Sequence, residues 1–352
     1  MSWALLCLDW RRTSTRPLPV FLNISDAAAW HPGCTRYTEL VNYCAARPLV
    51  AIAGPTASGK SHLAIRLALR FEGEIVNCDS LQLYRGFDIG TAKPSREELA
   101  LVPHHLIGIL DPDQESNAGH WARLAASSID KVSGRSRLPI VAGGTGFYLR
   151  ALLDGLAPGP ERNPELRSRL SRAESRRRGL LHRVLRRLDP PTAARIHPND
   201  INKLTRAVEI CLSSGGPASE LFVQQRAALQ GYRALKLVLS PPRADLYRAI
   251  EVRTVSMWSQ GLVEEVRDLL ASGVPPTAKP FESLGYKEAL ACVEGRMSPQ
   301  HAIDRITIET RQYAKRQITW FRREPDVHWL TGFGTDPSIE MRAIELLSAF
   351  LA

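Results

Sequence analysis

The sequence predicts an α/β fold in which a parallel sheet is combined with a helical insertion. From Pro48 onward, short apolar runs alternate with helical stretches, a pattern typical of a parallel sheet. The first apolar run leads into a glycine-rich turn and then into a helix. After Pro158 and Pro160 the apolar runs stop, and a charged helical stretch follows until one more apolar run returns.

Each expected strand is a short apolar run bounded by turn residues. The expected strands cover residues 49–53, 74–77, 105–110, 139–142 and 234–239. The expected core helices have apolar residues at helical spacing and cover residues 60–70, 117–132, 147–153, 243–259, 262–271, 283–294 and 299–322. Charged helices, broken near Pro190 and Pro198, are expected over residues 163–214.

The chain is expected to have three parts. Residues 1–47 show weak periodicity and form an N-terminal stretch of unknown role. The sequence leaves open whether this stretch is an extension, a presequence or the product of a wrongly chosen start codon. Residues 48–160 and 234–352 form the α/β core with its C-terminal helices, and residues 161–233 form the helical insertion.

The 352-residue chain has a net charge of +10, and its basic residues are clustered. Between residues 161 and 187 there are ten arginines and three glutamates, and between residues 305 and 323 there are six basic residues and only Glu309 as an acid. Such clusters favour an anionic partner, because they release counterions when they bind phosphates. Solvated helix faces are the alternative explanation.

The six cysteines are scattered and never form a Cys-x-x-Cys pair, which favours reduced thiols in a cytoplasmic protein over disulfides or a zinc site. The longest uncharged stretch, residues 138–149, is shorter than the roughly 20 residues that span a bilayer. We therefore expect a cytoplasmic protein without a membrane span, and we take it to be a monomer.

Residues 54–61 contain the most informative motif. Their sequence, GPTASGKS, matches the phosphate-binding loop pattern G-x-x-x-x-G-K-[ST] and lies between an expected strand and an expected helix. Backbone N–H groups of such a loop converge on phosphate oxygens, and the helix points the positive end of its dipole at the same anion. Lys60 would neutralise the phosphates and Ser61 would bind Mg²⁺. The motif predicts a P-loop NTPase-like core, whose ligand can be a nucleotide or another diphosphate.

Two further side chains are expected at the same edge of the sheet. Asp79 follows the second expected strand, at the carboxyl edge where open α/β folds bind ligands. A carboxylate there can act as a general base or support a magnesium ion, or it can simply form a turn before Ser80. The turn GGTG at residues 143–146 follows another expected strand and brings the hydroxyl of Thr145 to this edge.

The loop GPTASGKS and the segments DIGTAKP (residues 88–94) and TRQYAKRQ (residues 310–317) closely resemble the tRNA dimethylallyltransferase family, also called tRNA isopentenyltransferases or IPP transferases. Further matches follow in the same order at residues 79–80, 84–86, 103–106, 143–145, 197–200, 206–207, 285–287 and 319–321. The resemblance runs from about residue 50 to residue 323.

The resemblance implies an enzyme that transfers a dimethylallyl group from dimethylallyl diphosphate to N6 of adenosine 37, in tRNAs reading codons that begin with U. It implies that the diphosphate enters a channel through the core, with Mg²⁺ as the cofactor. The anticodon stem-loop would be held between the core and the insertion. Asp79 would remove a proton from the adenine amine, and Thr145 would align the reacting groups.

The resemblance also implies the residues that bind each substrate. The diphosphate ligands would be Gly54, Thr56, Ala57, Ser58, Gly59, Lys60, Ser61 and Arg253. The tRNA contacts would be Asp79, Ser80, Leu81, Gln82, Thr145, Arg167, Asn202, Lys203, Leu204, Thr205, Arg206, Gly285, Tyr286, Lys287, Lys315, Arg316 and Gln317.

Three other functions remain open from the sequence. A small-molecule kinase could use the same P-loop for ATP. An adenylate isopentenyltransferase could prenylate a free adenine nucleotide with the same core chemistry. A non-catalytic RNA-binding protein would explain the basic segments, but it would leave the P-loop and Asp79 without a task. The two basic segments and TRQYAKRQ favour tRNA as the partner.

Overall fold

The computed structural model describes residues 46–156, 159–223 and 229–352, so the N-terminal stretch expected at residues 1–47 lies almost wholly outside the described residues. The core is a parallel sheet with the strand order β3-β2-β4-β1-β5-β6. The strands are β1 (Arg47–Ala53), β2 (Gly73–Asn77), β3 (His104–His105), β4 (Leu138–Ala142), β5 (Tyr232–Leu239) and β6 (Val327–Leu330). The predicted α/β fold is confirmed.

The core helices fall into two groups along the chain. Between β1 and the insertion lie α2 (Lys60–Arg70), α3 (Arg96–Leu101), α4 (Ala118–Gly134) and α5 (Gly146–Leu153). After β5 come α11 (Arg243–Ser259), α12 (Leu262–Ala271), the 3-10 helix η3 (Lys279–Glu282), α13 (Tyr286–Val293), α14 (Pro299–Phe321) and α15 (Pro337–Leu351).

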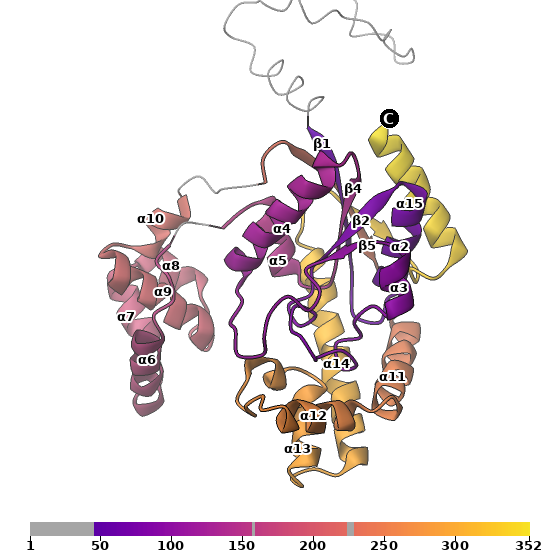
Figure 1. Ribbon diagram of the computed structural model, residues 1–352. Coiled ribbons are helices and arrows are strands. Elements are labelled where there is room, and N and C mark those ends of the chain that lie inside the picture. The colour runs from indigo at the N-terminus through magenta and orange to yellow at the C-terminus, as the bar shows by residue number, and fades with distance from the viewer. Residues whose placement is uncertain (1–45, 157–158, 224–228) are drawn as a thin grey trace, which may run out of the picture. The chain divides into compact units, whose positions relative to one another are not determined.

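Helices cover both faces of the sheet (Figure 1). α2 and α15 pack on one face, where Leu63 and Leu347 join the apolar side chains of the strands. α4 and α5 pack on the other face through residues such as Trp121 and Leu149. Residues 49–53 of β1 are all buried and form a continuous apolar run, as expected for a strand covered on both faces. Helices α11 to α14 gather at the carboxyl edge of the sheet (Figure 1).

The chain leaves the neighbouring strands β1 and β4 toward opposite faces of the sheet. After β1 it enters α2 on one face, and after β4 it enters α5 on the other. Such a divergence opens a crevice at the carboxyl edge, where open α/β sheets bind their ligands. The two loops at this crevice are the P-loop and the turn that contains Thr145. The strand order therefore positions the site.

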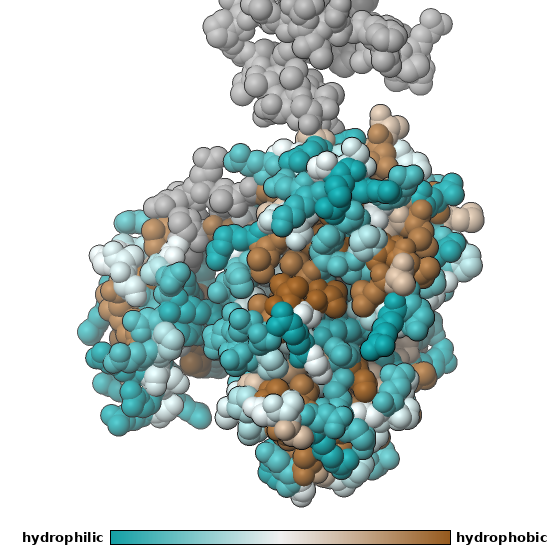
Figure 2. Space-filling model, viewed as in Figure 1, coloured by the Kyte–Doolittle hydropathy of each residue, from teal (hydrophilic) through white to brown (hydrophobic). Residues whose placement is uncertain are grey.

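The segment after residue 160 is helical, as predicted. It contains α6 (Pro164–Arg176), α7 (Leu180–Leu188), α8 (Pro190–Arg195), α9 (Ile201–Ser214) and α10 (Ala218–Val223), with breaks at Pro190 and near Pro198. These helices have an apolar cluster of their own that includes Leu181, Leu185 and Leu204. Their surface as seen in Figure 2 is mostly hydrophilic, as the charged sequence requires.

The strand expected at residues 105–110 is wrong beyond its first residue. Only His104–His105 pair with β2. Leu106 and Gly108 then take φ angles of 63° and 57°, which end the extended backbone. The apolar composition of this run therefore reflects burial in a loop rather than a strand, since Leu106 and Leu110 are both in the core.

Five regular elements lie outside the expected ranges, namely α3, α10, η3, β6 and α15. α3 begins with a capping box, in which Ser95 and Glu98 each accept the other's backbone N–H, and this pattern is visible in the sequence. α15 buries Ile339, Ala343 and Leu347 at a spacing of four residues. None of the helices in the described ranges is long and apolar enough to cross a membrane.

Candidate active site

The P-loop has the backbone conformation that its motif predicts. Gly54 and Gly59 have φ angles of 142° and 82°, and Ala57, which is not a glycine, has a φ of 61°. Alternating conformations of this kind turn successive N–H groups toward one point and form an anion-binding nest. The Nζ of Lys60 donates to the carbonyl oxygen of Pro55 at 2.7 Å. The loop therefore has the shape of an anion-binding nest.

A C-terminal loop supports the P-loop from outside. The N–H of Gly334 donates to the carbonyl of Ser58 at 2.8 Å. A Cβ atom on Gly59 would lie 2.9 Å from the nitrogen of Gly334, so the two backbones touch where both residues are glycines. Since Gly334 lies between β6 and α15, two of the elements outside the expected ranges help to hold the phosphate loop.

Asp79 is fixed in a turn directly after β2. Its N–H donates to Oδ1 of Asn77 at 2.9 Å, and its own Oδ1 accepts the N–H of Leu81 at 2.9 Å. The side-chain amide of Asn77 donates to the carbonyls of Asp79 and Leu106. One carboxylate oxygen of Asp79 is thus anchored by the backbone, while no hydrogen bond from a described residue engages the other.

The P-loop and Asp79 open into one cavity of about 390 Å³. Its wall combines apolar side chains with a few polar and charged ones, which is the usual composition of a small-ligand site. The lining residues are Thr56, Ala57, Asp79, Ser80, Leu81, Gly90, Thr91, Ile250, Arg253, Thr254, Met257, Leu262, Glu282, Ser283, Leu284, Gly285, Ile306, Thr310, Tyr313 and Arg316.

The charges around this cavity perturb one another. Burial lowers the pKa of Lys60 to about 8, repulsion from Arg253 adds to this, and the carboxylate of Asp79 opposes it. Burial also lowers the pKa of Arg253, again against the attraction of Asp79. Lys60 and Arg253 are both partly buried, and with Asp79 as the one anion that couples to them they leave a net positive site, which favours an anionic ligand.

Thr145 lies beside the cavity but does not line it. It precedes α5 as the N-cap residue, and its N–H donates to the carbonyl of Cys78 at 3.3 Å. A Cβ atom on Gly143 would lie only 2.1 Å from that same carbonyl oxygen. The turn after β4 and the end of β2 are therefore in direct backbone contact, one residue before Asp79.

The structure brings together some of the predicted site residues and not others. Those that line the cavity are Thr56, Ala57, Asp79, Ser80, Leu81, Arg253, Gly285 and Arg316. Those that do not line it are Gly54, Ser58, Gly59, Lys60, Ser61, Gln82, Thr145, Arg167, Asn202, Lys203, Leu204, Thr205, Arg206, Tyr286, Lys287, Lys315 and Gln317.

Two of the residues with predicted tRNA contacts have side chains that are fully buried. The side chain of Leu204 is 0% exposed within the apolar cluster of the insertion helices. Tyr286 is also 0% exposed, and its hydroxyl donates to Glu265 and accepts the N–H of Gly90. These side chains stabilise the protein, so only their backbones could meet a tRNA.

The predicted basic contacts of the insertion are organised by a buried carboxylate. Glu209 is fully buried and accepts hydrogen bonds from Arg167 at 3.1 Å, Arg206 at 2.9 Å and the N–H of Asn163 at 2.7 Å. Burial alone would raise the pKa of Glu209, but the bonds from Arg206 and Asn163 hold it below its ordinary value. The two arginines keep about a third of their side chains exposed, which leaves them able to contact a phosphate.

Several cavity residues had no predicted role. On α11 and α14, Thr254, Met257, Ile306, Thr310 and Tyr313 face the cavity at spacings of three or four residues. This spacing was visible in the sequence, but the same pattern describes any helix with one buried face. Burial and the negative charge of Asp79 raise the pKa of Tyr313 to about 12, so its phenol stays protonated. Tyr313 can therefore donate a hydrogen bond to a ligand.

The motif DIGTAKP, residues 88–94, packs against α12 and α13. The N–H groups of Asp88 and Ile89 donate to Glu265 of α12, and the hydroxyl of Thr91 donates to the carbonyl of Phe87 at 2.8 Å. A Cβ on Gly90 would lie 2.4 Å from the ring of Tyr286, so the loop can pack here only with glycine. The motif forms one wall of the cavity.

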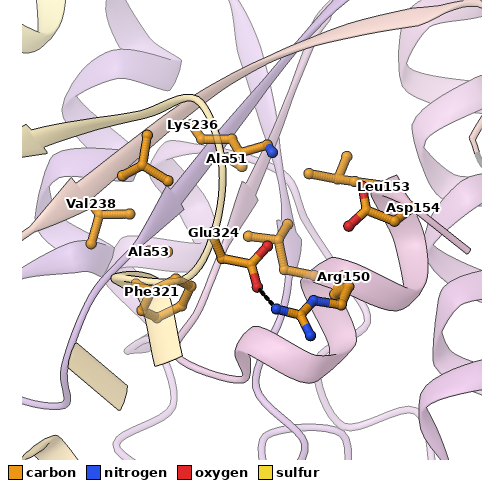
Figure 3. A pocket seen from close by; sticks show the side chains of 11 residues that line it. Ala51, Ala53, Arg150, Leu153, Asp154, Lys236, Val238, Phe321 and Glu324 are labelled. Atoms are coloured by element: carbon orange, nitrogen blue, oxygen red, sulfur yellow. Dashed lines mark hydrogen bonds and ion pairs between the residues drawn. The ribbon is translucent and has the colours of Figure 1, made fainter. Parts of the chain in front are cut away.

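A second pocket, close to the sheet, is too small for a substrate. Figure 3 shows it between β-strand residues such as Ala51 and Val238 and the ion pair of Arg150 with Glu324. Its volume of about 10 Å³ holds one water molecule at most. The ion pair joins α5 to the end of α14, so we assign the pocket a packing role.

The fold and the cavity together define a P-loop protein whose phosphate loop opens toward a carboxylate, the arrangement of a group-transfer enzyme. The sequence model of the IPP transferase family matches residues 82–324, and that of isopentenyl transferases matches residues 48–105. The tRNA dimethylallyltransferase of Solibacter usitatus is 56% identical over 86% of this chain and 99% of the relative. That of Koribacter versatilis is 50% identical over 85% and 97%. The chain belongs to the tRNA dimethylallyltransferase family.

Solved structures agree with this assignment. The tRNA isopentenylpyrophosphate transferase of Bacillus halodurans is 35% identical, with a TM-score of 0.63 over 86% of this chain and 96% of that chain. A eukaryotic dimethylallyltransferase acting on tRNA is 28% identical, with a TM-score of 0.74 over 87% of this chain and 79% of that chain. The likeness covers the core that contains the cavity.

The contact between the two turns yields a first prediction. The substitution Gly143→Ala should lower the free energy of unfolding by about 2–4 kcal/mol, because its Cβ would meet the carbonyl of Cys78 at 2.1 Å and push the backbones apart. Thermal and urea unfolding measure this loss. Transfer activity should also fall at temperatures where the variant is still folded. Displacement of the Cys78 carbonyl would move Asp79, which is the next residue.

Gly134→Ala is the matched control, since no atom lies within 4 Å of a Cβ at that residue. Gly134 ends α4 without a positive φ, so alanine there should stabilise by roughly 0.5–1 kcal/mol. Equal stabilities of the two variants would show that the close approach at Gly143 is relieved without cost.

Proposed function

We propose that this protein transfers the dimethylallyl group of dimethylallyl diphosphate to N6 of adenosine 37 in tRNAs that read codons beginning with U, as a cytoplasmic monomer with Mg²⁺. The observation that carries the proposal is the cavity in which the P-loop residues Thr56 and Ala57, Arg253 and Asp79 meet. It combines an anion site with a base, and family membership supplies the type of substrate.

Asp79 would act on the adenine amine. The lone pair of an exocyclic amine is delocalised into the ring, so removal of a proton while the new C–N bond forms lowers the barrier. The N–H of Leu81 holds one carboxylate oxygen of Asp79, which fixes the orientation of the other toward a substrate. The base must leave the stack of the anticodon loop to reach this carboxylate.

The P-loop and Arg253 would stabilise the leaving diphosphate. Negative charge grows on the bridging oxygen as the C–O bond breaks, and preorganised N–H groups and cations are most effective against charge that develops in the transition state. The Nζ of Lys60 donates to the carbonyl of Pro55 and can turn to a phosphate oxygen instead. Arg253 adds a second cation on the wall of the cavity.

The residues present fit a magnesium ion that is bound mainly through the substrate. Among the residues that the structure describes, no group of three or more His, Cys, Asp or Glu side chains forms a metal cage. Mg²⁺ commonly binds to one or two protein oxygens together with phosphates and water. Ser61 is exposed at the start of α2 and can supply such an oxygen. The ion would neutralise charge on the diphosphate.

The anticodon stem-loop would be held by two basic surfaces. On α14 the exposed Lys315 and Arg316 lie beside the cavity, which Arg316 also lines. On the insertion helices, the exposed arginines around the end of α6 would bind the phosphate backbone. A free nucleotide would need neither surface, which favours tRNA over AMP or ATP as the acceptor.

The direct test uses purified protein, Mg²⁺ and labelled dimethylallyl diphosphate. Unmodified tRNA with the sequence A36-A37-A38 should gain one five-carbon group on A37, detected by mass spectrometry of its nucleosides. A tRNA with G at position 37 is the control and should gain none. Prenylation of AMP in place of tRNA, or ATP hydrolysis without transfer, would overturn the proposal.

Asp79→Asn should lower kcat by about 10²–10⁴-fold, because the variant loses the general base. The side-chain oxygen of asparagine can still accept the N–H of Leu81, so the turn and the affinity for tRNA should be unchanged. Single-turnover transfer and tRNA binding are the two measurements. Asp113→Asn, at an exposed residue, is the control. Lost tRNA binding with a normal rate per bound complex would make Asp79 a structural residue.

The lowered pKa of Lys60 predicts a pH dependence of diphosphate binding. Above a pH of about 8 the free lysine is mostly neutral, whereas a bound diphosphate favours the ammonium, so binding must take up a proton. The affinity for dimethylallyl diphosphate without tRNA should therefore fall as the pH rises above about 8. Calorimetry at pH 8.5 in two buffers of different ionisation enthalpy measures the uptake. Lys60→Met should abolish it, and equal heats for the wild-type protein in both buffers would contradict it.

The basic surface of the insertion predicts a salt dependence. Arg172, Arg176 and Arg177 are exposed, and replacing all three with glutamine should reduce the slope of log K for tRNA against log salt by about 2–3. The control replaces three arginines of the core that each pair with a glutamate, Arg66, Arg137 and Arg342. An unchanged slope in the first variant would mean that α6 only faces solvent.

A further inference from the structure

Gln317 occupies a buried position between the two loops of the crevice. It lies on α14 and is only 6% exposed, although its neighbours Lys315 and Arg316 are exposed. A buried side-chain amide must satisfy its donor and its acceptor within the protein, since an unpaired one costs about 1–3 kcal/mol. Its partners therefore show what the residue does.

Both ends of the amide are bonded, and they bond to different loops. The Oε1 of Gln317 accepts the N–H of Thr56 in the P-loop at 2.9 Å. Its Nε2 donates to the carbonyl of Gly144 at 2.9 Å. One side chain thus spans the crevice from the loop after β1 to the loop after β4, where the chain diverges to opposite faces of the sheet.

Each partner precedes a residue of the site. Thr56 precedes Ala57, a non-glycine residue with a φ of 61°, a conformation that persists only where the surroundings enforce it. Gly144 precedes Thr145, and a Cβ on Gly144 would lie 2.2 Å from Nε2 of Gln317. The glycine therefore makes room for the amide. The bridge fixes the phosphate nest and the turn of Thr145 relative to each other.

The helix that carries Gln317 is itself tied to α5. Arg150 of α5 pairs with Glu324 and lies over the ring of Trp320 at 4.5 Å (Figure 3 shows the ion pair). A Cβ on Gly146 would lie 2.3 Å from the same ring. α14 is therefore held against α5 at Trp320 and, just beyond its last residue, at Glu324, so its glutamine cannot move away without breaking these contacts.

We propose that Gln317 is a positioning residue of the transfer reaction, which keeps the phosphate loop and the turn of Thr145 at a fixed separation, and that it does not contact tRNA. This inference rests on the proposed function. The direct tRNA contact predicted for Gln317 is replaced, because both polar ends of its side chain are engaged inside the protein. The neighbours Lys315 and Arg316 keep the exposure that a tRNA contact needs.

The test compares two variants of similar size. Gln317→Leu removes both bonds and should raise the KM for dimethylallyl diphosphate about tenfold and lower kcat about 100-fold, since small misplacements of reacting groups cost this much. Its tRNA affinity should stay within about twofold. Gln317→Glu keeps an acceptor for the N–H of Thr56 but sets a carboxylate oxygen against the carbonyl of Gly144. This variant should have a KM for dimethylallyl diphosphate within about threefold of the wild-type value, but its kcat should be lower than that of the wild-type protein.

A pH profile separates positioning from general destabilisation. Protonation of the new carboxyl in Gln317→Glu restores a donor toward Gly144, so its kcat relative to the wild-type protein at the same pH should rise as the pH falls. Gln300→Leu, an exposed glutamine on the first turn of the same helix, is the matched control and should retain normal kinetics. Thermal unfolding of every variant accompanies the kinetics.

The outcomes distinguish this inference from the proposed function. Transfer by the wild-type protein in the same assay establishes the function, and its absence overturns that function regardless of Gln317. Where the wild-type protein is active, Gln317→Leu with normal kcat and KM but weakened tRNA binding would overturn the inference and restore a direct contact. The inference would also be overturned if the kcat of Gln317→Glu relative to the wild-type protein did not change with pH. If Gln317→Leu does not fold, the glutamate variant alone decides.

Discussion

The site depends on the position of β4 between β1 and β2. The P-loop follows β1 and Asp79 follows β2, so two strand spacings, about 9–10 Å, separate their origins along the edge of the sheet. The proposed reaction needs such a gap, because the amine must attack the prenyl carbon while the diphosphate, on the other side of that carbon, leaves it. If β1 and β2 were neighbours, the base and the anion site would crowd each other. The turn after β4 fills the middle and brings Thr145 between them.

This gap must also be held rigid, and the sheet alone does not hold it. Strand pairing fixes the ends of β1 and β4, but the loops beyond them leave toward opposite faces. Their separation at the site is therefore set by what lies across the crevice, which is the amide of Gln317. A neutral amide suits this place, since it satisfies a donor and an acceptor without adding charge beside Lys60 and Asp79.

The sequence was sufficient for the parts of the site that local rules determine. The P-loop and the turn of Asp79 are contiguous motifs whose geometry follows from glycine positions and from the ends of strands. The run at residues 105–110 was misread, because burial in a loop and burial in a strand select the same apolar residues. The tRNA contact of Gln317 was predicted from the resemblance of its segment to the family, and nothing local in the sequence shows that this one side chain of the motif turns inward.

The contacts that complete the P-loop come from far along the chain. Thr56 and Gln317 are 261 residues apart, and Gly334, which donates to Ser58, lies further on. A long loop must close before such contacts form, so the phosphate nest reaches its final geometry only when the C-terminal helices have docked.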